Sequence, residues 1–170
     1  MTVRSCLLVM TTVVATALAL TFALFVGLPR WLLYNPTESA PRGWYLLRGS
    51  DALRPGDIAL VRLPHEAAQL ADARGYLPVG MPLIKQVAAA EGTEVCVRDG
   101  QVLVEGALSG RTLDRDRRGR GLAAWPGCRR LDADEFFLLS TSETASFDSR
   151  YFGPVPRESV LGRVVPLWTW

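Results

Sequence analysis

The stretch Pro82-Leu83-Ile84-Lys85-Gln86-Val87-Ala88-Ala89-Ala90 decides the fold of this chain. It is apolar apart from Lys85 and Gln86, and it predicts a buried strand. Lys85 is the only lysine of the protein, set against eighteen arginines. Arginine stays protonated in proteins, whereas a desolvated lysine can lose its proton near neutral pH and act as a base. The alternative is a lysine whose stem packs on the core while its ammonium group reaches water. This stretch alone leaves both interpretations open.

Length and composition limit the classes of function. A chain of 170 residues is long enough for one core, and the formal net charge of +2 does not suggest a nucleic-acid-binding protein. The chain has one histidine, His65, and its three cysteines show no metal-ligand spacing. A zinc site of the usual kind is therefore not expected, and we expect no metal and no cofactor.

The N-terminal residues predict a membrane anchor. No charged residue lies between Ser5 and Leu28, and such a run exceeds the roughly 20 residues that a helix needs to span a bilayer. The run ends in Pro29-Arg30-Trp31, which offers no small-residue cleavage site. We therefore expect a cytoplasmic tail over residues 1–5, an uncleaved transmembrane helix over 6–28 and the functional domain over 29–170. Basic residues lie on both sides of the run, so the charge bias does not decide its orientation.

Beyond the predicted anchor, the pattern is mainly β. Short apolar runs are separated by turn residues, and no alternation of strands with helices is present. Asp99-Gly100 is a strong hairpin signal between two such runs, and Gly106–Arg130 reads as a polar, Gly/Arg-rich excursion from the sheet. The polar stretch Pro64–Gly75 reads as a surface segment. Strands are expected at Gly43–Arg48, Ile58–Leu63, around Lys85, at Val95–Val97, Val102–Val104, Phe136–Leu139 and Ser159–Trp168.

Three blocks of the sequence resemble the signature blocks of type I signal peptidases. They are Asn35–Tyr45 (NPTESAPRGWY), Pro82–Ala89 (PLIKQVAA) and Ser146–Val155 (SFDSRYFGPV). Within that superfamily, the Asn-x-Thr-x-Ser-x-Pro-x-Gly form of the first block resembles the conjugative-transfer branch, the TraF-type peptidases. All three blocks occur in order behind a single apolar N-terminal segment. The resemblance implies a signal-peptidase-like β domain.

The resemblance also implies a role for each matching residue. Ser39 would be the nucleophile and Lys85 its general base, a pairing that needs no histidine. The hydroxyl of Thr37 and the backbone N–H of Ser39 would hold the oxyanion. Taken alone, a serine in such a turn is more often a simple turn hydrogen bond.

The third block supplies the supporting residues. Ser146 matches a serine that hydrogen-bonds and orients the lysine, and Asp148 and Arg150 match a pair that braces the site. The conjugative branch is often described with this aspartate as a third catalytic member. An acidic group touching Lys85 would raise the pKa of the lysine, so we favour a bracing role. Alone, Asp148 and Arg150 read as a surface ion pair.

Two features depart from many bacterial leader peptidases. A Gly-Asp-Asn stretch is replaced by Ser140-Thr141-Ser142-Glu143, and the residue after the nucleophile is Ala40 rather than methionine. Both differences suit the conjugative branch.

The resemblance predicts a serine endopeptidase of the bacterial inner membrane whose catalytic domain lies on the periplasmic side. Its substrate would be a preprotein or a prepilin of a conjugation apparatus. Its expected partners are the bilayer and that apparatus, with no nucleic acid. The alternatives are a non-enzymatic assembly factor of the transfer apparatus and a general type I leader peptidase. Intact Ser39, Lys85 and Ser146 argue against the assembly factor, because a binding module does not need them.

Two cysteines are expected to form a disulfide. Cys96 and Cys128 lie beyond the predicted anchor, in an oxidising compartment where free thiols rarely persist, whereas Cys6 lies within the apolar run. The alternative is two unrelated buried cysteines, since the sequence does not place their Cα atoms.

Overall fold

The computed structural model describes residues 3–26, 31–49, 53–140 and 143–170. The chain divides into two compact units, Met1–Leu32 and Leu33–Trp170. The predicted end of the anchor at residue 28 and the first two residues of the predicted tail lie outside the described residues.

The first unit consists mainly of helix α1, Val3–Val26. Its described side chains include four threonines, and Thr12 and Thr16 donate from their hydroxyls to carbonyls three and four residues earlier in the helix. The predicted helix is therefore present, but the predicted transmembrane span is not supported. Among the described residues, no helix combines the length and the hydropathy that crossing a membrane requires.

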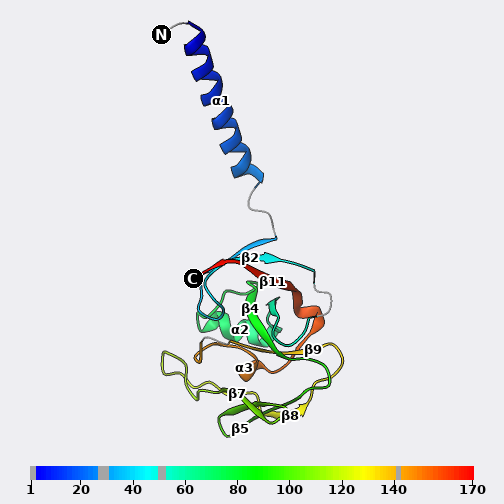
Figure 1. The fold of residues 1–170 in the computed structure, drawn as a ribbon. Helices are drawn as coiled ribbons and strands as arrows, with labels where there is room; N and C mark the ends of the chain where they lie inside the picture. Colours follow the sequence, from blue (N-terminus) through cyan, green and yellow to red (C-terminus); the bar gives the residue numbers. More distant parts are fainter. Residues whose placement is uncertain (1–2, 27–30, 50–52, 141–142) are drawn as a thin grey trace. The chain divides into compact units, whose positions relative to one another are not determined.

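The second unit is built on a seven-stranded sheet with the order β1-β2-β11-β3-β4-β9-β10. Figure 1 shows β4 near the middle of this unit, between the C-terminal strand β11 and strand β9. The predicted mainly β fold is thus confirmed. The strands span Leu32–Asn35 (β1), Gly43–Leu47 (β2), Ile58–Val61 (β3), Leu83–Ala89 (β4), Glu135–Leu139 (β9), Val155–Pro156 (β10) and Val160–Thr169 (β11).

Strand β4 joins three hydrophobic clusters. Val87 lies opposite Leu138 and belongs to the first cluster, which also holds Ala59, Val61 and Val155. Ile84 points to the opposite face, where it packs with Tyr45 and Val164. A bulge between Val87 and Ala89 shifts the register, so that Ala89 pairs with Phe137 and joins the second cluster. Because side chains alternate along a strand, Lys85 shares the face of Leu83 and Val87.

A four-stranded sheet, in the order β7-β6-β5-β8, forms the second layer of this unit. β5 (Glu94–Arg98) and β6 (Gln101–Val104) form the predicted hairpin, and both Asp99 and Gly100 have positive φ as its turn requires. β7 spans Ala107–Arg111 and β8 spans Gly127–Arg130.

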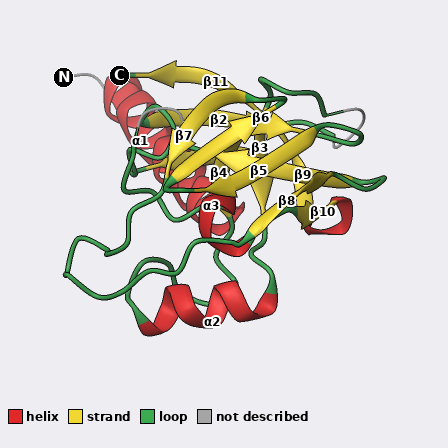
Figure 2. Ribbon diagram, turned by 90° about the horizontal axis from the view of Figure 1, so that it is seen from below, coloured by secondary structure: helices red, strands yellow, loops and turns green. Residues whose placement is uncertain are grey.

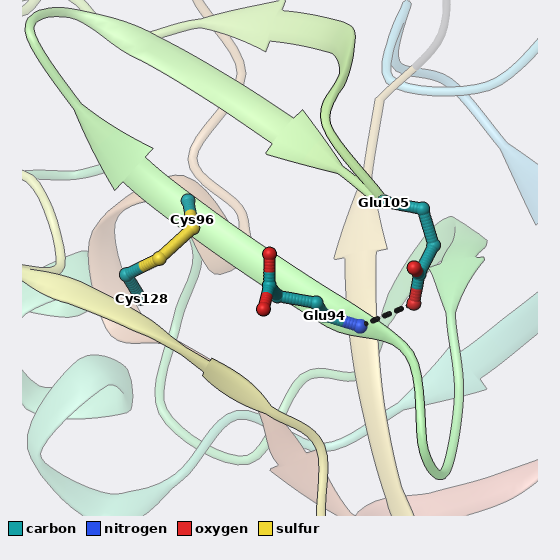
Figure 3. The surroundings of a disulfide bond; sticks show 4 residues. All are labelled: Glu94, Cys96, Glu105 and Cys128. Atoms are coloured by element: carbon teal, nitrogen blue, oxygen red, sulfur yellow. Dashed lines mark hydrogen bonds between the residues drawn. A yellow bond between two sulfur atoms is a disulfide. The ribbon is translucent and has the colours of Figure 1, made fainter.

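The predicted disulfide is confirmed, because Cys96 of β5 and Cys128 of β8 are direct cross-strand partners and are bonded. Figure 3 shows this bond beside Glu94, whose backbone N–H donates to Glu105 Oε1 at 2.6 Å.

The stretch read as a polar surface segment is in fact a helix, α2, over His65–Ala73 (Figure 2). Ala67 and Ala71 are buried, and their spacing of four residues places them on one face. The burial of two alanines on one side of an otherwise polar helix explains why the apolar pattern was too weak to indicate a helix.

The Gly/Arg-rich excursion is more ordered than the sequence suggests. It supplies β7 and β8, and the loop between them is organised by the carboxylate of Asp116. That carboxylate accepts from the Tyr76 hydroxyl at 2.5 Å and from Arg120 Nε at 2.7 Å, as well as from the backbone N–H groups of Arg118 and Arg120. Burial raises the Asp116 pKa, but the hydrogen bonds from Tyr76, Arg120 and Arg118 together outweigh it and lower the pKa. The remaining elements are the short helices α3 (Ser149–Phe152) and η1 (Arg157–Ser159).

The disulfide should stabilise the protein. Cys96 and Cys128 are 32 residues apart, and closing a loop of this length contributes about 3–4 kcal/mol in the chain-entropy account. We expect the double variant Cys96→Ala/Cys128→Ala to lower the free energy of unfolding by about this amount, measured by denaturant titration of the full chain. Cys6→Ala, which removes a thiol outside the loop, is the control. Equal stability of the double variant and the wild type would contradict the prediction.

Candidate active site

Asn35 organises the loop that carries Ser39. Its buried side-chain amide Nδ2 donates to three carbonyls of this loop, those of Thr37, Ala40 and Pro41, at 3.1, 3.0 and 3.2 Å. Its Oδ1 accepts from the backbone N–H and the hydroxyl of Thr37 at 3.1 and 2.8 Å. One side chain therefore fixes the whole turn from residue 35 to residue 41.

The end of this loop is fixed by Gly43 and Tyr45. The hydroxyl of the fully buried Tyr45 donates to the Pro41 carbonyl at 2.6 Å. Gly43 has φ of +142°, and a Cβ at this position would lie 2.1 Å from the carbonyl oxygen of Trp168. Only glycine lets the chain enter β2 so close to the backbone of β11.

The Ser39 hydroxyl has two acceptors for its single proton. It lies 2.9 Å from Thr37 Oγ1 and 3.4 Å from the carbonyl oxygen of Ile84. Thr37 already donates its only hydroxyl proton to Asn35, so Ser39 is the donor in their pair. Ser39 is half-buried and Thr37 is exposed, which leaves both hydroxyls open to a ligand.

Lys85 follows Ile84 in β4, directly after the carbonyl that Ser39 contacts. The lysine side chain is only 3% exposed, and its Nζ donates to the hydroxyl of the buried Ser146. The snorkelling interpretation of Lys85 is therefore wrong, because the ammonium group does not reach water. Within the described residues the Ser39 hydroxyl bonds to residues 37 and 84, and no direct hydrogen bond joins Ser39 to Lys85.

The surroundings of Lys85 lower its pKa to about 8. The largest cause is burial, which disfavours the charged ammonium form. The charges of the neighbouring residues partly cancel: the Asp148 and Glu143 carboxylates raise the pKa, and the Arg150 guanidinium lowers it. A large share of Lys85 is therefore neutral at mildly alkaline pH, as a general base requires.

Asp148 and Arg150 form a buried ion pair. Asp148 Oδ1 accepts from Arg150 Nε at 2.7 Å, and Oδ2 accepts from Arg150 Nη2 at 2.7 Å, so the pair is bidentate. Their side chains are 0% and 3% exposed, so the surface-pair interpretation is wrong. Arg150 also donates to four backbone carbonyls, which belong to Arg111, Glu143, Thr144 and Ser146. The guanidinium thus holds the loop that presents Ser146 to Lys85.

Ser140 connects this ion pair to the Ser39 loop. Its backbone N–H donates to Asp148 Oδ2 at 2.9 Å, and its hydroxyl donates to the carbonyl oxygen of Ser39 at 2.8 Å. Residues 39 and 140 are 101 positions apart in sequence, so this contact exists only in the folded chain.

The structure therefore brings the sequence-predicted residues together in three pairs: Ser39 with Thr37, Lys85 with Ser146, and Asp148 with Arg150. It adds Asn35 and Ser140, to which the sequence reading assigned no role. The signal for Ser140 was a hydroxyl directly after the apolar run Phe136–Leu139, at the end of a buried strand. The signal for Asn35 was its place as the first residue of the block Asn35–Tyr45, which resembles a signature block of type I signal peptidases.

Comparison with known proteins gives a consistent result. Residues 4–170 match the family described as "Signal peptidase, peptidase S26". The chain is 35% identical over 162 residues to the conjugal transfer protein TraF of Agrobacterium fabrum, covering 90% of this chain and 91% of the relative. It is 31% identical over 147 residues to a plasmid transfer protein TraF of Escherichia coli, covering 80% and 82%. A solved signal peptidase I from Enterococcus faecalis aligns over 69% of this chain and 100% of that chain, with 18% identity and a TM-score of 0.43, too low to bear on function.

The family match extends over nearly the whole chain, and the TraF relatives cover most of it. The chain therefore belongs to the peptidase S26 family of signal peptidases.

Proposed function

We propose that this protein is a serine endopeptidase that uses Ser39 as nucleophile and Lys85 as general base to remove signal or leader segments from exported proteins. The observation that carries the proposal is the single lysine of the chain, buried, with a pKa lowered to about 8, one residue after the carbonyl that the Ser39 hydroxyl contacts. A docking module has no use for a desolvated amine one residue after the carbonyl that the Ser39 hydroxyl contacts, which disfavours the assembly-factor alternative.

In the first step, neutral Lys85 takes the proton of the Ser39 hydroxyl as Oγ attacks the scissile carbonyl carbon. The resulting Lys85 ammonium then gives the proton to the leaving amine as the peptide bond breaks. In deacylation, neutral Lys85 takes a proton from the attacking water and then gives it to Ser39 Oγ as the ester bond breaks. This step releases the new C-terminal carboxyl group and restores the Ser39 hydroxyl. Ser146 orients the Lys85 amine through these steps, because its hydroxyl bonds directly to Nζ.

The oxyanion of the tetrahedral intermediate would be held by the backbone N–H of Ser39 and the hydroxyl of Thr37. In the resting structure the Thr37 proton is donated to Asn35 Oδ1. A rotation about the Cβ–Oγ bond of Thr37 redirects this proton toward the oxyanion, and the backbone N–H of Thr37 keeps its own bond to Asn35. The loop therefore stays fixed while the hydroxyl changes partner.

Asp148 acts as a brace in this proposal. Among the described residues, its carboxylate accepts from Arg150 and from the Ser140 backbone N–H, and both carboxylate oxygens are used by these bonds. A carboxylate so fully occupied does not serve as a proton acceptor in the reaction, and its charge raises the pKa of Lys85. Its contribution is to hold the two loops that carry Ser39 and Ser146.

The substrate we propose is a prepilin of a conjugation apparatus. The support is the similarity to relatives named as conjugal or plasmid transfer proteins, which covers most of this chain. A general leader peptidase is the second candidate, because a probable signal peptidase I-2 of Synechocystis is 35% identical over 86 residues, covering half of this chain and 38% of that protein.

We also propose that the protein works at the bacterial inner membrane with its β domain on the periplasmic side. The uncharged sequence from residue 5 to residue 28 supports membrane association, and the Cys96–Cys128 disulfide supports an oxidising compartment. A reporter that is active only in the periplasm should be active when fused after Trp170, and the protein should sediment with membranes. Activity of a reporter restricted to the cytoplasm would contradict this localisation.

Replacing the base tests the proposed chemistry. Lys85→Arg keeps the positive charge, but guanidinium does not release its proton near neutrality. We expect kcat/KM to fall by a factor of about 10²–10⁴, the usual contribution of general-base catalysis, on a purified preprotein or a quenched peptide with an Ala-x-Ala segment. Lys85→Met, which removes the amine but keeps the apolar stem, should be equally inactive and should stay folded. Appreciable cleavage by either variant would contradict the base role.

The same role sets the pH dependence of turnover. Because the neutral amine is the active form and the Lys85 pKa is about 8, kcat/KM should rise as the pH increases through about 8 and level off above it. Ser146→Ala removes the partner of Nζ and should move the midpoint, whereas Ser109→Ala, in the exposed strand β7, should not. A flat profile between pH 6 and pH 9 would contradict the assignment.

Asp148→Asn should lower both stability and turnover. The variant leaves the Arg150 guanidinium buried without its counter-charge, and breaking a buried pair in this way typically costs about 3–5 kcal/mol. Asp134→Asn, which breaks an exposed pair with Arg157, is the matched control and should change stability by less than about 1 kcal/mol. Loss of turnover with an unchanged melting temperature would instead favour a direct catalytic role for Asp148.

A further inference from the structure

We propose that Ser140 is a positioning residue, which couples the buried Asp148–Arg150 pair to the nucleophile loop and so fixes the place of Ser39. The inference rests on the proposed function, because the position of Ser39 matters only if its hydroxyl reacts. It assigns a role to a residue that lies outside the nucleophile, the base and the ion pair.

Ser140 contacts both the Asp148–Arg150 ion pair and the loop that carries Ser39. The Ser140 backbone N–H donates to Asp148 Oδ2, which also accepts from Arg150 Nη2. The Ser140 hydroxyl donates to the carbonyl oxygen of Ser39 and accepts from the backbone N–H of Glu143. Ser140 itself is fixed because it directly follows Leu139, the last residue of β9, which pairs with Gln86 of β4. Ser140 is thus held next to the strand that carries Lys85 through Leu139, and it contacts the loop that carries Ser39 through its hydroxyl.

The contact acts on the part of the nucleophile loop that Asn35 does not hold. Asn35 binds the carbonyls of residues 37, 40 and 41, and it leaves the carbonyl of Ser39 to Ser140. This carbonyl belongs to the residue whose hydroxyl must reach Lys85. A hydrogen bond at this point sets the orientation of the Ser39 backbone, and therefore the direction of its side chain.

The ion pair is accordingly connected to both Lys85 and Ser39, in each case through one serine. Through Arg150 and the Ser146 carbonyl it holds the partner of Lys85, and through Ser140 it holds Ser39. Asp148 can in this way affect the reaction strongly while the described contacts of its carboxylate go only to Arg150 and Ser140.

The test compares Ser140→Ala, which removes the hydroxyl but keeps the backbone N–H to Asp148, with Ser140→Thr, which keeps the hydroxyl. The control is Ser109→Ala, which also removes a serine hydroxyl bonded to a backbone carbonyl, in strand β7. With a quenched Ala-x-Ala peptide, we expect Ser140→Ala to lower kcat about 10- to 100-fold with KM changed less than about twofold, because small misplacements of a reacting group have effects of this size. Ser140→Thr should regain most of kcat, and the midpoint of the pH profile should stay the same in both.

Coupling to the ion pair is measured by a double-mutant cycle. If Ser140 transmits the effect of Asp148, adding Ser140→Ala to Asp148→Asn should cause little further loss of kcat. Losses that multiply would overturn the coupling. Unchanged kcat in Ser140→Ala, or an equal loss in Ser140→Thr, would overturn the positioning role.

A measurement independent of turnover separates this inference from the proposed function. Amide hydrogen exchange of residues 37–42 should be faster in Ser140→Ala than in the wild type, Ser140→Thr or Ser109→Ala. A wild-type chain without peptidase activity would overturn the proposed function, and the exchange measurement would still decide whether Ser140 holds the Ser39 loop. Equal exchange in all four proteins would overturn that contact.

Discussion

The buried ion pair of Asp148 and Arg150 is the constraint on which the site depends. Removing two charges from water is costly, and it is offset here by a bidentate contact, further hydrogen bonds to Asp148, and four backbone carbonyls that accept from the guanidinium. A pair with this many hydrogen bonds constrains the loops that supply its partners. The pair therefore connects residues 143–146, before α3, to Ser140, the residue after β9.

The pair also balances the electrostatics of Lys85. A lone carboxylate near the amine would favour the ammonium form, but the Arg150 guanidinium beside Asp148 compensates part of this effect. Burial in the cluster of Ala59, Leu83 and Val87 then dominates and lowers the lysine pKa. The same core that stabilises the sheet thus lowers the pKa of Lys85.

Local sequence signals predicted much of the fold. The hairpin at Asp99–Gly100 followed from turn chemistry, and the strand around Lys85 from its apolar run, because both depend on neighbouring residues only. Helix α2 was missed because its buried face consists of two alanines, and the order within the Gly/Arg-rich excursion was missed because it depends on Asp116 binding Tyr76, 40 residues away. The membrane span was predicted from the length and hydropathy of the uncharged N-terminal run alone. Among the described residues, no helix meets the criteria for such a span.

The sequence by itself determined which groups are available: one lysine, the Asn35–Gly43 block with its serine, and the Asp148–Arg150 pair, each readable from spacing within a short segment. It also determined the family, through those same segments. Only the tertiary structure decided that Lys85 is buried, that its amine bonds to the Ser146 hydroxyl, and that Ser140 donates to the carbonyl of Ser39. Lys85 and Ser146 are separated by 61 positions in the sequence, and Ser39 and Ser140 by 101 positions. The physical reason is that burial and hydrogen bonds over such separations depend on how the strands and loops pack together, which no local pattern encodes.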